Sequence, residues 1–155
     1  MKAIRVQHTG GPEVMELAEV AAPQPKATEA LVKVKVAGVN SIDGWFRDGR
    51  LRTPLPFIPG QEGAGVVTET GPQAKVVKVG DRVAWSGTLG SYAEYVAAPE
   101  EHLVPVPSSI SDEQAAAVMM HGLTAHYLVN DAHKLKAGET ALVHAAAGGV
   151  GLLVV

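Results

Sequence analysis

The sequence has no cysteine, and this absence excludes three kinds of chemistry. Disulfide bonds, thiolate nucleophiles and cysteine-rich zinc sites all need a residue that the chain does not contain. The sequence also has no apolar run that approaches the length of a membrane span, and residues 1–8 lack the long apolar stretch of a signal peptide. We therefore expect a cytoplasmic protein that does not enter a membrane.

Positive charge is scarce as well. The 13 Lys and Arg residues are outnumbered by 16 Asp and Glu residues, which gives a net charge of −3. The basic residues are spread along the chain, so they do not form the positive patch that nucleic acid requires, and a small-molecule partner is expected instead. With 46% hydrophobic and 19% charged residues, the 155-residue chain predicts one folded domain and part of a second.

Short strands dominate the expectation for the first hundred residues. Residues 2–7 and 14–19 predict a hairpin across a Gly-Pro turn, and residues 29–39 alternate between valine and lysine as a half-buried strand does. Residues 40–59 predict a loop with a short helical piece. Four further strands are expected at 65–69, 81–85, 91–97 and 102–106, separated by turn signals. This spacing predicts a partly open β-barrel.

The pattern becomes helical after Ser108. Ser111 followed by Gln114 is typical of a capping box, and residues 115–129 predict a helix interrupted only by Gly122. The expected domain organisation is a barrel over residues 1–110, a connecting helical region over 111–137, and the start of a cofactor-binding domain over 138–155.

A glycine-rich motif lies near the C-terminal end. Residues 141–143 predict a short buried strand that leads into a tight turn, with alanine at position 146 in place of the first glycine of a dinucleotide-binding fingerprint. We expect the turn to bind a cofactor through backbone N–H groups at a helix start. Its residues are Ala147, Gly148, Gly149, Val150 and Gly151. The motif alone is equally compatible with a glycine turn between a strand and a helix in an unrelated fold.

Five motifs occur in a fixed order along the chain. They are Asn40-Ser-Ile-Asp-Gly-Trp-Phe-Arg, Pro59-Gly-Gln-Glu-Gly-Ala-Gly, Val79-Gly-Asp-Arg-Val, Gly90-Ser-Tyr-Ala-Glu-Tyr and Ala145-Ala-Ala-Gly-Gly-Val-Gly. In this arrangement the chain resembles the zinc-independent quinone oxidoreductase (zeta-crystallin-like) branch of the medium-chain dehydrogenase/reductase superfamily. The resemblance runs from Met1 to Val155 and covers the N-terminal half of a family member.

The resemblance implies a fold class and a cofactor. The fold is mainly β with α: a GroES-like, partly open β-barrel, followed by the first strand and Gly-rich turn of a Rossmann domain. The implied cofactor is NADPH, although the residues that separate NADPH from NADH would lie beyond Val155. Without a second strand beside residues 141–143, we expect the segment from Thr140 onward to be poorly stabilised and to bind NADPH weakly by itself.

No metal site is expected. By resemblance, Gln61 stands where zinc-dependent relatives have a histidine ligand, and a carboxamide binds zinc poorly. His121, His126 and His133 are spaced by five and seven residues rather than by the four that place two ligands on one helical face. We interpret these histidines as helix-surface or core-edge residues.

The resemblance also assigns candidate site residues. Asn40 and Thr124 correspond to residues near the nicotinamide, and Tyr127 and Trp45 to the walls of the substrate pocket. The alternatives are an Asx turn for Asn40, helix packing for Thr124 and a half-buried aromatic for Tyr127. Trp45 replaces a tyrosine of the family, which removes a hydroxyl, and His121 replaces a glutamine. Asp43 and Arg47 are interpreted as a structural pair.

Three functions remain open from the sequence. The first is a zinc-independent, NADPH-dependent reductase that transfers hydride to a quinone or a conjugated enone, both of which are electrophilic without a metal. The second is an enoyl reductase of the polyketide or fatty-acid type, and the third is a truncated, non-catalytic GroES-like domain. For the full-length enzyme we expect a small-molecule substrate and a homodimer.

Overall fold

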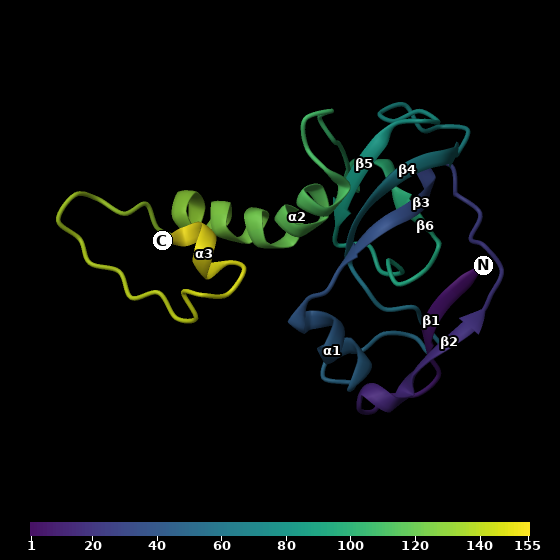
Figure 1. The fold of residues 1–155 in the computed structure, drawn as a ribbon, viewed down its shortest axis with the longest axis horizontal. Helices are drawn as coiled ribbons and strands as arrows, with labels where there is room; N and C mark the ends of the chain where they lie inside the picture. Colours follow the sequence, from purple (N-terminus) through teal and green to yellow (C-terminus); the bar gives the residue numbers. More distant parts are fainter.

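The computed structural model describes every residue from 1 to 155 and contains two open antiparallel sheets (Figure 1). The smaller sheet pairs β1 (Lys2–Val6) with β2 (Met15–Glu19). The larger sheet has the strand order β6-β3-β4-β5-β7. Its strands are β3 (Glu29–Gly38), β4 (Glu62–Thr70), β5 (Arg82–Ser86), β6 (Tyr95–Pro99) and β7 (Leu103–Pro105). The mainly β, partly open architecture predicted from the strand spacing is confirmed.

Apolar side chains from the larger sheet form the main core. The central residue is Trp85, which is fully buried, and its indole Nε1 donates a hydrogen bond of 2.9 Å to Ser91 Oγ. Gly63 lies opposite Trp85 on β4, and a Cβ atom there would come within 2.5 Å of the indole ring. The glycine therefore makes room for the largest side chain of the core. The other members are Ala30, Val32, Val67, Val77, Val83, Val96, Ala98 and Leu103.

The smaller sheet is joined to the rest of the barrel by backbone hydrogen bonds. Val6 N donates to Phe57 O at 2.9 Å, and Phe57 N donates to Val6 O at 3.1 Å. The two side chains pack with Val14, which lies in the 3₁₀ turn η1 (Pro12–Val14) between β1 and β2. A second 3₁₀ turn, η2 (Glu100–His102), leads from β6 into β7.

Helix α2 (Asp112–Tyr127) begins at the predicted capping box. Gln114 N donates to Ser111 Oγ at 3.2 Å, and Ser111 N donates to Gln114 Oε1 at 3.1 Å. The helix starts three residues earlier than expected and continues through Gly122 without interruption. Its buried Ala115 and Ala116 pack against small residues of the sheet, so the helix backbone lies close to β4 and β5.

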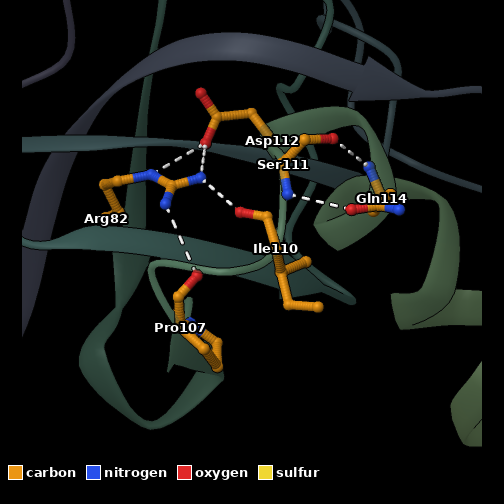
Figure 2. A network of polar contacts seen from close by, with 6 residues as sticks. All are labelled: Arg82, Pro107, Ile110, Ser111, Asp112 and Gln114. Carbon is orange, nitrogen blue, oxygen red and sulfur yellow. Dashed lines mark hydrogen bonds and ion pairs between the residues drawn. The ribbon is translucent and has the colours of Figure 1, made fainter.

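Arg82 on β5 anchors the start of α2 (Figure 2). Its guanidinium donates to Asp112 Oδ1 from Nε at 3.1 Å and from Nη2 at 2.7 Å. The same group donates to the carbonyl oxygens of Ile110, at 2.8 Å, and Pro107, at 3.5 Å. The planar guanidinium of Arg82 thus holds both the turn before α2 and the carboxylate of Asp112, the first residue of α2.

The C-terminal part of the chain lies beyond the far end of α2. In Figure 1 this helix leads away from the sheets, and the segment after it lies at the opposite end of the molecule from the N-terminus. It consists of the π-helical turn η3 (Leu128–Ala132), a stretch without strands, and α3 (Gly151–Val154). No helix in the structure has the length and apolar character needed to cross a bilayer.

The strand predicted at residues 141–143 is not formed, and this part of the expectation is wrong. The region has no strand assignment, and Leu142 is 83% exposed. A strand that is buried on both faces needs neighbours on its two edges, and no strand of this chain lies beside residues 141–143. The backbone N–H and C=O groups of residues 141–143 therefore have no partner strand, and an apolar sequence alone does not form a strand.

Candidate functional site

Asn40 lies where β3 ends and the short helix α1 (Ser41–Arg47) begins. It is the N-cap of α1, with extended backbone angles, and its backbone N donates to Asp43 Oδ2 at 2.9 Å. Its side-chain Nδ2 donates to Glu62 Oε2, also at 2.9 Å. Asn40 thus caps α1 through its backbone N–H, and its side-chain amide is bonded to a second element, β4.

Asp43 is a buried carboxylate that connects α1 to the loop before β6. Its Oδ2 accepts a hydrogen bond of 2.9 Å from the hydroxyl of Tyr92. Burial of the phenol, reinforced by the negative charge of Asp43, raises the pKa of Tyr92 above its ordinary value. The expected pairing of Asp43 with Arg47 is wrong, because Arg47 Nε instead donates to Gly10 O at 3.2 Å.

Glu62 is the functional candidate that the sequence analysis missed. It is only 1% exposed, and its Oε1 accepts a short hydrogen bond of 2.5 Å from Met120 N, in the middle of α2. Because its Oε2 accepts from Asn40, one carboxylate bridges the end of β3 and α2. The available signal was a charged residue directly before the small and apolar residues 63–67 of the strand, since buried charges need specific partners.

Thr124 continues this polar chain by one helical turn. Its Oγ1 donates to Met120 O at 2.7 Å, a bond to the carbonyl four residues earlier in α2. The backbone of Met120 therefore donates to Glu62 through its N–H and accepts from Thr124 at its C=O. The structure brings Asn40 and Thr124, 84 residues apart in the sequence, into one hydrogen-bonded chain.

Trp45 and Tyr127 do not join this chain. Trp45, on α1, is 43% exposed, and the Arg50 guanidinium lies 5.7 Å from its ring centroid. Tyr127 ends α2 and is 57% exposed. Both aromatic side chains present surface that a flat ligand could contact, but neither makes a hydrogen bond with Asn40, Glu62 or Thr124.

Gln61 lies directly before Glu62, and its side-chain Nε2 is buried without a hydrogen-bond partner. A carboxamide nitrogen is a donor with no lone pair for a metal ion. In the structure, no group of three or more His, Asp or Glu side chains is arranged to hold a metal ion.

The glycine-rich turn at residues 147–151 lies beside a hollow of about 500 Å³, next to the end of α2. Gly148 closes the turn, because its backbone N donates to Ala145 O at 2.8 Å. The backbone N–H groups of Gly149, Val150 and Gly151 donate to no acceptor within the chain. The turn therefore supplies three unpaired donors, the arrangement that suits an anionic group.

His121 lies at the same turn. Its imidazole is packed against Gly149, where a Cβ atom would approach the ring to 2.4 Å. The ring also lines the hollow, whose other residues come from the segment after α2. The structure thus brings the histidine of α2 to the glycine turn, although the two are far apart in the sequence.

The comparison with known families identifies the barrel. The model of the alcohol dehydrogenase GroES-like domain matches residues 26–108, more than half of the chain. The chain belongs to this family. The match contains β3 to β7 together with Asn40, Glu62 and Tyr92, so the barrel side of the polar chain lies within the GroES-like domain.

Curated relatives of this GroES-like chain extend over nearly all of it. It is 46% identical to the quinone oxidoreductase of Pseudomonas aeruginosa over 153 residues, which are 97% of the chain and 47% of that relative. The human quinone oxidoreductase is 42% identical over 156 residues, which cover 98% of this chain and 47% of that relative. The chain spans about half the length of the curated relatives it matches.

Solved structures agree with the sequence relatives. The quinone oxidoreductase of Pseudomonas syringae pv. Tomato DC3000 superimposes with a TM-score of 0.96 at 44% identity, over 99% of this chain and 48% of that one. The Escherichia coli quinone oxidoreductase complexed with NADPH gives a TM-score of 0.96 at 38% identity, with the same coverage. The resemblance predicted from five ordered motifs, to the N-terminal half of such proteins, is confirmed.

Proposed function

We propose that this chain is part of a zinc-independent, NADPH-dependent reductase that transfers hydride to a quinone or a conjugated enone. The observation that carries the proposal is the 46% identity to a quinone oxidoreductase over nearly the whole chain, a range that includes the Asn40–Glu62–Met120–Thr124 chain. In this proposal residues 1–110 form the substrate domain, residues 138–155 begin the cofactor domain, and residues 111–137 connect the two.

The glycine-rich turn is the proposed contact for the pyrophosphate of NADPH. Residues 147–151 would hold it through the unpaired N–H groups that follow Gly148. NADPH supplies the hydride and therefore most of the chemistry. Asn40 and Thr124 orient the nicotinamide, Trp45 and Tyr127 form the apolar walls that exclude water, and a quinone accepts the hydride without a metal.

Zinc independence in this proposal is supported by the residue types available. The chain has no cysteine, and Gln61 presents a carboxamide directly before Glu62. A hard or borderline cation would have to rely on isolated carboxylates and histidines, which do not gather in this structure. The proposed protein is cytoplasmic and forms a homodimer when it has the length of its relatives.

A fusion tests the proposal. The chain is joined to the remaining half of the Pseudomonas aeruginosa relative, and NADPH consumption is followed with 1,4-benzoquinone in the presence and absence of a chelator. We expect quinone reduction that the chelator does not alter, and a kcat/KM reduced about 10- to 100-fold by Asn40→Ala through lost positioning. Val76→Ala, at an exposed site outside the network, is the control and should leave kcat/KM unchanged.

Two results would refute this function. One is a chelator-sensitive oxidation of simple alcohols by the fusion, which would require a metal site. The other is an Asn40→Ala fusion whose kinetic constants equal those of the parent, because the proposed site depends on this amide.

A further inference from the structure

The polar chain contains a carboxylate whose two oxygens serve two different parts of the fold. Glu62 Oε2 accepts from the Asn40 side chain, and Glu62 Oε1 accepts from the backbone of Met120 in α2. No lysine, arginine or histidine forms an ion pair with it, so its charge is balanced only by these donors. A buried charge is costly unless its hydrogen bonds are complete, which makes this geometry demanding.

The backbone around Glu62 is shaped to admit the carboxylate. Gly38 pairs with Glu62 across β3 and β4, and a Cβ atom at Gly38 would come within 2.1 Å of Glu62 Oε2 and 2.7 Å of its Cδ. A larger residue at position 38 would therefore displace the carboxylate from Asn40. The glycine at the end of β3 keeps the space in which Glu62 reaches Asn40.

The orientation of the Asn40 amide follows from its contact with Glu62. Nδ2 donates to Glu62 Oε2 at 2.9 Å, whereas the start of α1 is capped through the Asn40 backbone, whose N donates to Asp43 Oδ2 and whose carbonyl accepts from Asp43 N. A carboxylate offers only acceptors. Rotation of the amide by half a turn would place its oxygen against the carboxylate, so a single orientation is selected.

We propose that Glu62 is a positioning residue that fixes the orientation of Asn40 and its distance from Thr124. This inference rests on the proposed function, in which Asn40 and Thr124 contact the nicotinamide. Glu62 is only 1% exposed and would itself touch neither cofactor nor substrate. It holds Asn40 directly, and it holds Thr124 through the backbone of Met120, whose N–H donates to Glu62 and whose carbonyl accepts from Thr124.

The isosteric variant Glu62→Gln separates this role from simple packing. A glutamine has one acceptor oxygen, so it cannot accept from both Asn40 Nδ2 and Met120 N. Because the Met120 N–H is fixed in the helix, the glutamine oxygen faces it and the glutamine NH₂ group faces the Asn40 NH₂ group. The bond donated by Asn40 Nδ2 is lost although shape and volume are preserved, whether the two NH₂ groups face each other or the Asn40 amide turns over to accept from the glutamine.

A second substitution should restore the pairing. In the double variant Asn40→Asp with Glu62→Gln, the glutamine NH₂ donates to the new aspartate, the glutamine oxygen still accepts from Met120, and the aspartate caps α1. The total charge is unchanged. Asn40→Asp alone would instead place two carboxylates against each other, so both single variants should lose the hydrogen bond between positions 40 and 62 and the double variant should regain it.

Side-chain amide hydrogen exchange in the 155-residue chain gives a readout that needs no cofactor. The Asn40 NH₂ protons should exchange at least about tenfold faster in Glu62→Gln than in the parent, since a broken hydrogen bond no longer protects them. In the double variant, protection should appear on the NH₂ group of the introduced glutamine. Ser86→Ala is the matched control, because Ser86 Oγ donates to the Met120 sulfur at 3.7 Å and makes no hydrogen bond with Asn40.

Kinetics of the fusion enzyme complete the test. Glu62→Gln should lower kcat/KM for NADPH about tenfold, and Ser86→Ala should show no change. The double variant has no amide at position 40, so it should regain protection from exchange without regaining kcat/KM. Unchanged Asn40 exchange in Glu62→Gln would overturn the inference, and so would altered exchange with unchanged kcat/KM while Asn40→Ala remains impaired. If Asn40→Ala itself is unimpaired, the proposed function fails instead.

Discussion

The strand β3 and the segment at residues 141–143 have similar apolar sequences, but only β3 forms a strand. Val32 on β3 is fully buried, whereas Leu142 is 83% exposed. β3 pairs with β4 on one side and with β6 on the other, and the segment at 141–143 pairs with nothing in the chain. An apolar run therefore becomes a strand only where neighbouring strands accept and donate its backbone hydrogen bonds.

The same contrast extends to the two ends of the proposed site. Its barrel end, with Asn40, Asp43, Glu62 and Tyr92, is held by buried side chains and by hydrogen bonds between distant residues. Its glycine-turn end rests on α3, which has four residues, and only Gly151 is buried between residues 126 and 155. The barrel end of the proposed site is therefore preorganised in this chain, and its glycine-turn end is not.

The largest expected effect is in the main core. Trp85→Ala removes the largest buried side chain and its bond to Ser91, and we expect it to lower the free energy of unfolding by about 3–5 kcal/mol. Urea titration monitored by circular dichroism measures the change. Leu142→Ala is the matched substitution in the exposed segment and should stay within about 0.5 kcal/mol. Equal losses for the two variants would remove the contrast between the regions.

The second effect concerns the attachment of α2 to the barrel. Arg82→Ala removes the paired bonds to Asp112 and the bonds to two loop carbonyls, so we expect a loss of about 1–3 kcal/mol in the free energy of unfolding. Arg82→Lys keeps the charge without the planar fork and should lose an intermediate amount. A parent-like unfolding midpoint for Arg82→Ala in urea would show that the anchor drawn in Figure 2 is dispensable.

The third effect depends on pH. The folded-state pKa of Tyr92 is raised, first by burial and then by Asp43, so the folded chain keeps this proton where the unfolded chain releases it. The stability due to Tyr92 is then present below its unfolded pKa of about 10 and declines as the pH rises further. Thermal unfolding of the parent and of Tyr92→Phe between about pH 8 and 11 tests this.

Tyr92→Phe should cost about 1–2 kcal/mol at neutral pH, because Asp43 loses a donor, and it should weaken the decline above about pH 10. Identical slopes for the two proteins would assign the alkaline loss to other groups.

Much of the barrel could be predicted from the sequence because its signals are local. The valine and lysine alternation of β3, the Ser111–Gln114 capping box and the hairpin of β1 and β2 all appear where expected. The strand at 141–143 could not be judged locally, since its formation depends on a neighbour elsewhere in a fold.

The candidate site was predictable only in part for a similar reason. Asn40 and Thr124 were found by resemblance to a family motif, while Glu62 between them was missed. Its importance comes from a bond to a helix 58 residues later, a relation that no local pattern contains. Asp43 was paired with Arg47 because both belong to one motif of the resemblance, whereas the fold brings Tyr92 to Asp43.

Backbone hydrogen exchange tests the contrast between the two regions most directly. Measured on the 155-residue chain near neutral pH, the amides of residues 32–36 in β3 should exchange with the slowness of global unfolding. The amides of residues 141–144 should exchange within about tenfold of the rate of an unfolded chain, because they donate to no strand. Protection of residues 141–144 equal to that of β3 in a monomer would contradict the account.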